Sequence, residues 1–184
     1  ENMKHIKEAS LNIFSLSERI RAAGGCAKIS LQSLNLSEYV GVVGVALREP
    51  FVKAGVPFEM DVAENLPPVQ VDPSKFKELL LEVLKNAAEA AVKGSGRALL
   101  QVTGPGVVSP ASEGRVDILV SNTGSQIASD KLADVFRPFQ GSKNGAHLGL
   151  GLTIAAMLAH QTGARLGVSS QDSTTTFWVS VPVA

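Results

Sequence analysis

Apolar residues recur at two different periods along this chain, and the changes between them mark the expected helices and strands. A period of three to four residues predicts helices over 1–23, 36–54, 73–93 and 150–161. The first three segments each have an apolar stripe or face and are otherwise mainly polar, as a helix on the surface of a core is, and the fourth is apolar along most of its length. In the third segment the apolar positions are Phe76, Leu80, Val83, Leu84, Ala87 and Ala91.

The expected helix ends carry capping residues. Asn35 and Glu38 have the spacing of a capping box before the second helix, with Asn in place of the usual Ser or Thr, and Gly55 is expected to end it. Asp72 is a capping residue followed by Pro73, which suits the first position of the third helix.

Alternating apolar and polar positions predict six extended segments. They are 56–63, 67–72, 98–108, 115–124, 165–170 and 174–183. The third and fourth are expected to be antiparallel neighbours, and the last two are expected to form a hairpin. A short helix is expected over 130–136, and residues 28–36 read as an extended linker. Helices followed by strands mixed with helices indicate a sheet covered on one face.

The first helix has a narrow apolar stripe with alternating spacings of three and four. Its members are Ile6, Ala9, Ile13, Leu16, Ile20 and Ala23. One interpretation is a helix packed on its own domain. We favour the other, a helix that pairs with other helices, because the rest of its surface is polar.

Composition excludes several classes of protein. Seventeen basic residues balance seventeen acidic ones without a basic cluster, so neither nucleic acid nor an anionic membrane surface is an expected partner of this segment. Cys26 is the only cysteine, which fits a reducing, cytoplasmic location. The chain opens at Glu1, and we expect it to be part of a longer protein that could be membrane-anchored.

Two glycines two residues apart, Gly149 and Gly151, stand where the last helix begins. Glycine weakens helices, so its presence there indicates a close approach to the backbone. A helix N-terminus favours an anion as the visitor. The alternative is a helix start that is simply softened by glycine. The segment is not a dinucleotide fingerprint, because the third glycine and the preceding strand are missing.

Three further positions carry candidate chemistry. Asn86 lies in the middle of the third helix, where Asn is unfavourable, and its amide oxygen suits Mg²⁺. Glu82, one turn earlier, could orient or deprotonate a nucleophile, although together with Glu89 it also fits an ordinary solvated face. Asn122 ends a buried strand, where a side-chain carbonyl can read an amine of a base; the alternative is an Asn-containing turn.

The order of these motifs resembles the GHKL superfamily, and most closely the catalytic domain of bacterial sensor histidine kinases. The segments that carry the resemblance are LLLEVLKNAAEAA, VSNTGSQI, VFRPFQGSK, GLGLTIAAMLA and STTTFWVSVP, in that order. They are similar to the family's N box, first glycine box, Phe box with the start of an ATP lid, second glycine box and closing strand.

This resemblance implies a Bergerat fold: an α/β chain of the α+β two-layer type, with a mixed, mostly antiparallel sheet covered on one face by helices and preceded by an N-terminal helix. It also implies ATP and Mg²⁺ as ligands. Glu82 and Lys143 are the implied catalytic residues, and Asn86 is the implied Mg²⁺ ligand. The implied nucleotide-binding residues are Asn86, Asn122, Gly124, Gln126, Phe136, Phe139, Gly149, Leu150, Gly151, Leu152 and Thr175.

The chain departs from the family pattern in four places. Asn122 replaces an Asp, Gln126 replaces a Gly, His147 stands before the second glycine box, and Glu82 stands where many histidine kinases have Asn. The first three favour an alternative function, a degenerate module with weak or no ATP binding that holds partners. Glu82 alone suggests a GHKL hydrolase.

The resemblance divides the chain into two parts. Residues 1–34 would be the second helix of a dimerisation hairpin plus a linker, and 35–184 the kinase catalytic domain. A homodimer through the N-terminal helix and a response regulator receiver domain are the implied partners. His5 does not match the family's phosphoacceptor, which we expect upstream of Glu1.

Overall fold

A computed structural model describes residues 28–108, 112–140 and 149–184. A five-stranded mixed sheet forms one layer, in the order β2-β4-β5-β7-β6. β2 runs parallel to β4, and the other three pairings are antiparallel. The strands are β2 (Phe58–Val62), β4 (Ala98–Thr103), β5 (Arg115–Thr123), β7 (Thr174–Pro182) and β6 (Arg165–Gln171).

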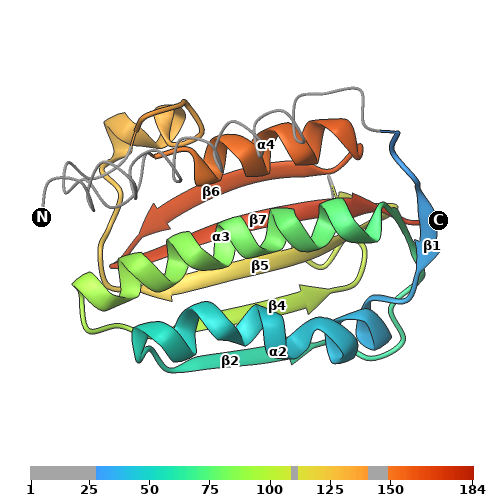
Figure 1. Ribbon diagram of the computed structural model, residues 1–184, viewed down its shortest axis with the longest axis horizontal. Helices are drawn as coiled ribbons and strands as arrows, with labels where there is room; N and C mark the ends of the chain where they lie inside the picture. The colour runs from blue at the N-terminus through green and yellow to red at the C-terminus, as the bar shows by residue number, and fades with distance from the viewer. Residues whose placement is uncertain (1–27, 109–111, 141–148) are drawn as a thin grey trace, which may run out of the picture.

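Three helices form the second layer, and all of them cover the same face of the sheet (Figure 1). They are α2 (Leu36–Ala54), α3 (Pro73–Lys93) and α4 (Gly151–Gln161). α3 lies between the other two and contacts both of them. The expected two-layer fold, with a mostly antiparallel mixed sheet covered on one face, is confirmed. The expected N-terminal helix falls outside the described residues.

The predicted caps form as the sequence indicates. The Asn35 side chain accepts hydrogen bonds from the backbone N–H groups of Ser37 and Glu38, and Gly55 ends α2 in the left-handed conformation. The Asp72 side chain accepts from Ser74 and Lys75 at the start of α3. The first backbone N–H groups of a helix have no acceptor within the helix, and these side-chain oxygens satisfy them.

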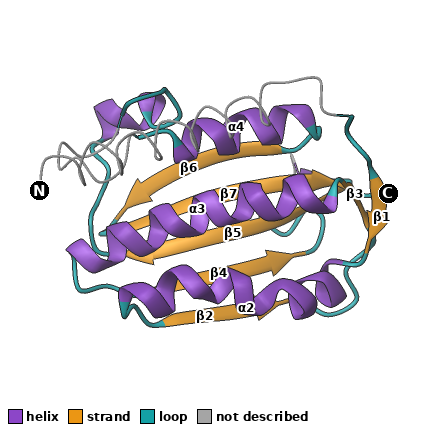
Figure 2. Cartoon of the chain, viewed as in Figure 1, coloured by secondary structure: helices purple, strands orange, loops and turns teal. Residues whose placement is uncertain are grey.

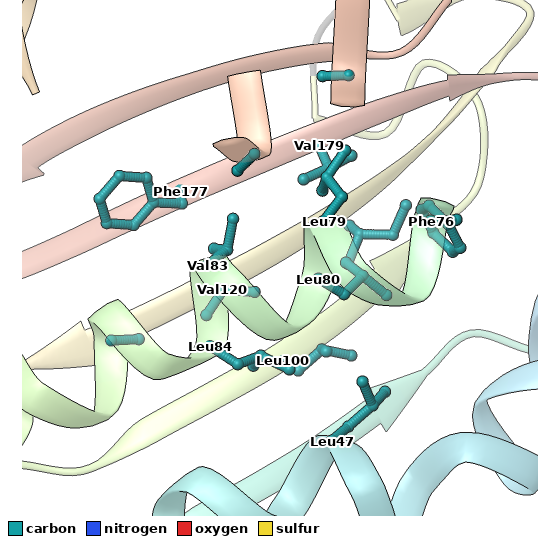
Figure 3. Packing of buried hydrophobic residues seen from close by; sticks show 14 of the residues in the cluster. Leu47, Phe76, Leu79, Leu80, Val83, Leu84, Leu100, Val120, Phe177 and Val179 are labelled. Carbon is teal, nitrogen blue, oxygen red and sulfur yellow. The ribbon is translucent and has the colours of Figure 1, made fainter. Parts of the chain in front are cut away.

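The core lies between the two layers, and one face of α3 fills its centre. Figure 3 shows Leu79, Leu80, Val83 and Leu84 of this helix directed toward Leu100, Val120, Phe177 and Val179 of the sheet. Inward-facing residues alternate with outward-facing ones along β5, so Val116, Ile118, Val120 and Asn122 share the helix-covered face.

Two short elements differ from the sequence prediction (Figure 2). Within the expected linker, β1 (Gln32–Leu34) pairs with β3 (Val69–Val71) in a separate two-stranded sheet. β1 therefore precedes the expected domain boundary at residue 34/35 and is joined to a strand beyond it. The short helix after β5 is a 3-10 helix, η2 (Ser129–Asp134).

Candidate functional site

Asn122 is a buried amide at the end of the central strand β5. Its backbone is paired with Ala98 of β4 and Thr175 of β7, so the position of the residue is fixed from both sides. The side chain is 1% exposed, and neither Oδ1 nor Nδ2 has a hydrogen-bond partner in the structure. Each buried polar group left without a partner costs about 1–3 kcal/mol. Among the residues that the structure describes, no group therefore uses the hydrogen-bonding capacity of this amide.

The turn after β5 is held directly against α3. Gly124 has φ 132°, and a Cβ atom built on it would lie 2.8 Å from the carbonyl oxygen of Ala90. The N–H of Ser125 donates to the same carbonyl over 3.3 Å. Only glycine allows this approach with this backbone conformation. Gly124 therefore joins the end of β5 to the last turns of α3.

Thr175 stabilises the same region from β7. It is 2% exposed, and its Oγ1 lies 2.9 Å from Oγ of Ser170 on β6. Ser170 Oγ in turn accepts a hydrogen bond from the N–H of Ile127, over 3.0 Å. Thr175 and Ser170 thus fix the segment that follows Gly124. Ser170 carries no motif that marks it in the sequence, although the hairpin register places it opposite Thr175.

Glu82 and Asn86 belong to α3, on the helix layer of the site. Glu82 is buried, with 6% of its surface exposed, and the half-exposed Lys85 ammonium lies 3.0 Å from its Oε1. Asn86 is half-buried and Glu89 is exposed. The three residues therefore do not form one uniform solvated face. A carboxylate this buried, with a cation beside it, differs from an ordinary surface glutamate.

The start of α4 lies on Glu82. A Cβ atom on Gly151 would lie 2.9 Å from Oε2 of Glu82, so glycine permits the contact between the two helices. No side chain caps α4, and its first turn contains no acidic residue. The Glu82 carboxylate therefore lies beside the start of α4, where the partial positive charge of a helix N-terminus is concentrated. This contact between α3 and α4 explains why position 151 is glycine, and the sequence alone does not reveal it.

Gly149 and Phe139 lie on either side of the undescribed residues 141–148. Gly149 has φ 64°, and its carbonyl oxygen accepts a hydrogen bond of 3.1 Å from the N–H of Phe139. Phe139 itself has φ 63° and is 73% exposed. Phe139 and Gly149 are therefore held next to each other. Lys143 and His147 belong to it and lie outside the described residues.

The remaining predicted residues occupy different environments. Phe136 is half-buried and packs edge-on against Phe177, with ring centroids 6.4 Å apart. Leu150 is buried and Leu152 is half-buried, and both pack on the core. Gln126 is exposed. Thr153 Oγ1, on the first turn of α4, is buried without a hydrogen-bond partner and was not identified from the sequence.

These contacts place the predicted residues along one face of α3. Glu82, Asn86 and Ala90 are spaced four residues apart, so they lie on neighbouring turns of the same face. Glu82 contacts Gly151 at the start of α4, and the Ala90 carbonyl contacts Gly124 after β5. Asn86 consequently lies between the turn of α3 that contacts the start of α4 and the turn of α3 that contacts the segment after β5. The described residues contain no group of three His, Cys, Asp or Glu side chains arranged to hold a metal.

Residues 71–184 match the family described as histidine kinase-, DNA gyrase B- and HSP90-like ATPases. Because this match covers more than half of the chain, the chain belongs to that ATPase family. It is 29% identical to the sensor protein FixL of Bradyrhizobium diazoefficiens over 182 residues, which are 96% of this chain and 34% of FixL. The resemblance predicted from the sequence is confirmed.

Solved structures share the fold. Full-length ShkA in complex with AMPPNP has a TM-score of 0.78 at 22% identity, over 98% of this chain and 38% of ShkA. The histidine kinase ThkA in complex with the response regulator TrrA has a TM-score of 0.73 at 19% identity, over 98% of this chain and 51% of ThkA.

The chain spans 24–34% of the length of the first curated relatives. Among the described helices, none has the length and apolar character needed to cross a bilayer.

Proposed function

We propose that this chain carries the ATP-binding catalytic domain of a two-component sensor histidine kinase. It transfers the terminal phosphoryl group of ATP to a histidine outside its 184 residues. The observation that carries the proposal is the shared face of α3, on which Glu82 contacts the start of α4 and Ala90 contacts the turn that follows Asn122, with Asn86 between them. The family match and the similarity to sensor kinases support it.

In this proposal the triphosphate lies at the start of α4. The first N–H groups of a helix have no acceptor within it, so those from Leu150 to Thr153 at the start of α4 can donate to phosphate oxygens. Lys143 contacts the terminal phosphate. The adenine lies near Asn122, Gly124 and Thr175, and Gln126, Phe136 and Phe139 flank the nucleotide. Positioning and neutralisation of charge supply most of the rate enhancement in such transfers.

Mg²⁺ fits the donors that α3 offers. Asn86 presents an amide oxygen on a half-buried turn, with the Glu82 carboxylate one turn away. Mg²⁺ keeps several waters and takes few ligands from the protein, so one Asn oxygen beside phosphates is sufficient. When bound, the ion neutralises charge on the phosphates. Asn86 is the proposed protein ligand, and Glu82 orients the nucleophile or accepts its proton.

One observation favours a second function, a partner-binding module with weak or no ATP binding. Because Asn122 is 1% exposed, a base reaches its amide only after the side chains around it move apart. That movement costs free energy and lowers affinity. We therefore expect a dissociation constant of about 10⁻⁴–10⁻³ M for Mg-ATP, about −4 to −5.5 kcal/mol.

Calorimetric titration with and without Mg²⁺ tests the proposal. The parent protein should bind ATP more tightly with Mg²⁺, and Asn86→Ala should remove this Mg²⁺ dependence while preserving the fold, since Ala is the better helix former. Glu89→Ala, at an exposed position on the same helix, is the control and should behave like the parent. Absence of ATP binding at millimolar concentration would leave the partner-binding module as the better account.

The proposed partners are a second copy of this chain and a response regulator. The apolar stripe of residues 1–23 supports pairing through the N-terminal helix, and residues 1–34 form the proposed hairpin helix and linker ahead of the catalytic domain at 35–184. The complex of ThkA with its response regulator supports the second partner. Sedimentation that finds only monomer at high concentration would contradict the homodimer.

A further inference from the structure

The outer face of α2 carries a patch of exposed apolar side chains. Val42, Val45 and Val52 are 83%, 85% and 77% exposed, and their spacing places them on one side of the helix. The opposite side of α2 packs into the core through Leu47 and Phe51. Because a helix that is apolar on two sides is typically covered on both, the outer face of α2 has the character of a contact surface.

The described part of the chain does not cover this patch. α2 is the outermost of the described helices, next to the edge strand β2 (Figure 1). None of the three valines belongs to the core cluster or packs against it. Valine is also a poor helix former, so helix stability does not explain its presence at these positions. Arg48 leaves the patch open, since its guanidinium lies 5.8 Å from the ring centroid of Phe58 on β2.

The charges at the two ends of α2 make this face complementary to itself. Glu38 is exposed in the first turn and Lys53 is exposed in the last. Two α2 helices packed antiparallel, about a two-fold axis near Ala46, bring Glu38 of each copy toward Lys53 of the other. Parallel packing would oppose like charges. Lys53 lies 2.6 Å from Glu49 of its own helix, where both side chains are exposed and accessible to a second charged group.

The same antiparallel arrangement matches the apolar positions. An axis near Ala46 places the two Val45 side chains beside each other and brings Val42 of one copy within about one helical turn of Val52 of the other. Such a two-fold contact uses one surface twice, so it needs no partner of a different sequence. A second copy of this chain is therefore the occupant that both the charges and the valines fit.

We propose that α2 packs antiparallel on the α2 of a second copy of this chain, through Val42, Val45 and Val52. This interface is distinct from the proposed pairing of residues 1–23 and does not depend on the proposed nucleotide site. One helix from each copy buries less than about 1,200 Å², the range of weak and transient interfaces. With both interfaces each copy contacts two others, so dimers formed through residues 1–23 are joined to one another.

Sedimentation equilibrium of the whole chain tests the interface. Ile13→Asp, which places a charge in the apolar stripe of residues 1–23, is the background in which association through α2 is measured alone. This variant should still dimerise with rising concentration. Adding Val45→Glu should weaken that dimer by more than about tenfold, because a carboxylate is costly to bury in an apolar contact. Val107→Glu, at an exposed apolar position after β4, is the control and should change nothing.

Reciprocal charge reversal tests the antiparallel arrangement in the same background. Glu38→Lys and Lys53→Glu should each weaken the dimer, and the two together should restore it, because the opposed charges have then exchanged places. A monomer at the highest soluble concentration of Ile13→Asp overturns the proposal, as does equal association of Val45→Glu and Val107→Glu. Failure of the double reversal to restore the dimer overturns it as well. ATP binding should be the same in all of these variants, so the proposed kinase function is tested separately.

Discussion

At the residue scale, the side chains that hold this fold together form bonds that can be tested one at a time. The Asp72 carboxylate accepts hydrogen bonds from three backbone N–H groups. Those of Ser74 and Lys75, in the first turn of α3, have N···O distances of 3.1 Å, and that of Ser30 has 2.9 Å. Burial alone would raise the pKa of Asp72, but these three donors outweigh it and lower the pKa below its usual value. The residue thus joins the chain before β1 to the helix that carries the site.

This lowered pKa predicts a pH dependence of stability. The folded pKa lies below the unfolded one, so the stabilisation is present above the unfolded value of about 4 and is lost as the pH falls through the folded value. Asp72→Ala should cost about 1–2 kcal/mol of unfolding free energy at neutral pH, and less in acid. Urea unfolding followed by the single tryptophan, Trp178, measures this.

Asp130→Asn is the matched control, because Asp130 is exposed in the first turn of η2. It should change the unfolding free energy by less than about 0.5 kcal/mol at either pH. An Asp72→Ala cost that stays the same from neutral pH to acid would contradict the role assigned to the Asp72 charge.

At the element scale, α3 is the part of the molecule that organises the site. Its buried face fills the core, and Glu82, Asn86 and Ala90 lie along the adjoining face toward α4 and the end of β5. The two contacts that define the site are both permitted by glycine, at Gly151 and Gly124. A displacement of α3 would therefore alter both ends of the proposed nucleotide site together.

Two glycine substitutions test this packing. Gly124→Ala combines a backbone φ of 132° with a Cβ 2.8 Å from the Ala90 carbonyl, so it should destabilise the protein by about 1–3 kcal/mol. Gly41→Ala, inside α2, meets nothing within 4 Å and should stabilise by about 0.5–1 kcal/mol. Thermal unfolding of both variants measures the difference. Equal effects of the same sign would show that β5 does not need to approach α3 so closely.

The helix ends of this fold were predictable because capping is local. Asn35, Gly55 and Asp72 act within three or four residues of themselves, and each caps as the sequence predicts. The sequence predicts only a linker at β1, because three residues carry little periodicity and the partner strand β3 lies far along the chain: Gln32 pairs with Val71. Local patterns contain no information on such pairings.

The site was predictable in part for the same reason. The spacing around Asn86 and the glycines at 149 and 151 are local features, and the family resemblance gave them their order. The contact between Glu82 and Gly151 joins α3 to α4, and the missing partners of Asn122 depend on what β4, β7 and the helices place around it. These features arise only when the chain is folded, so they were found in the structure.

At the scale of the whole molecule, the helices divide the sheet into a covered face and an open one. Asn122 and Thr175 belong to the covered face, whereas Trp178 alternates with Phe177 and Val179 and lies on the other, where its indole covers Gly167. A nucleotide in the proposed site is thus separated from Trp178 by the sheet. Tryptophan fluorescence reports unfolding, and a signal from the covered face is needed to follow binding.

The most direct test is a titration of isotope-labelled protein with Mg-ATP, followed through the backbone amide signals in NMR spectra. We expect shifts to concentrate at Asn86, around Asn122 and Gly124, and at residues 149–152, with little change at Trp178 and its open-face neighbours. Shifts confined to the open face, or none at millimolar nucleotide, would contradict the claim that α3, β5 and α4 together form the ATP site.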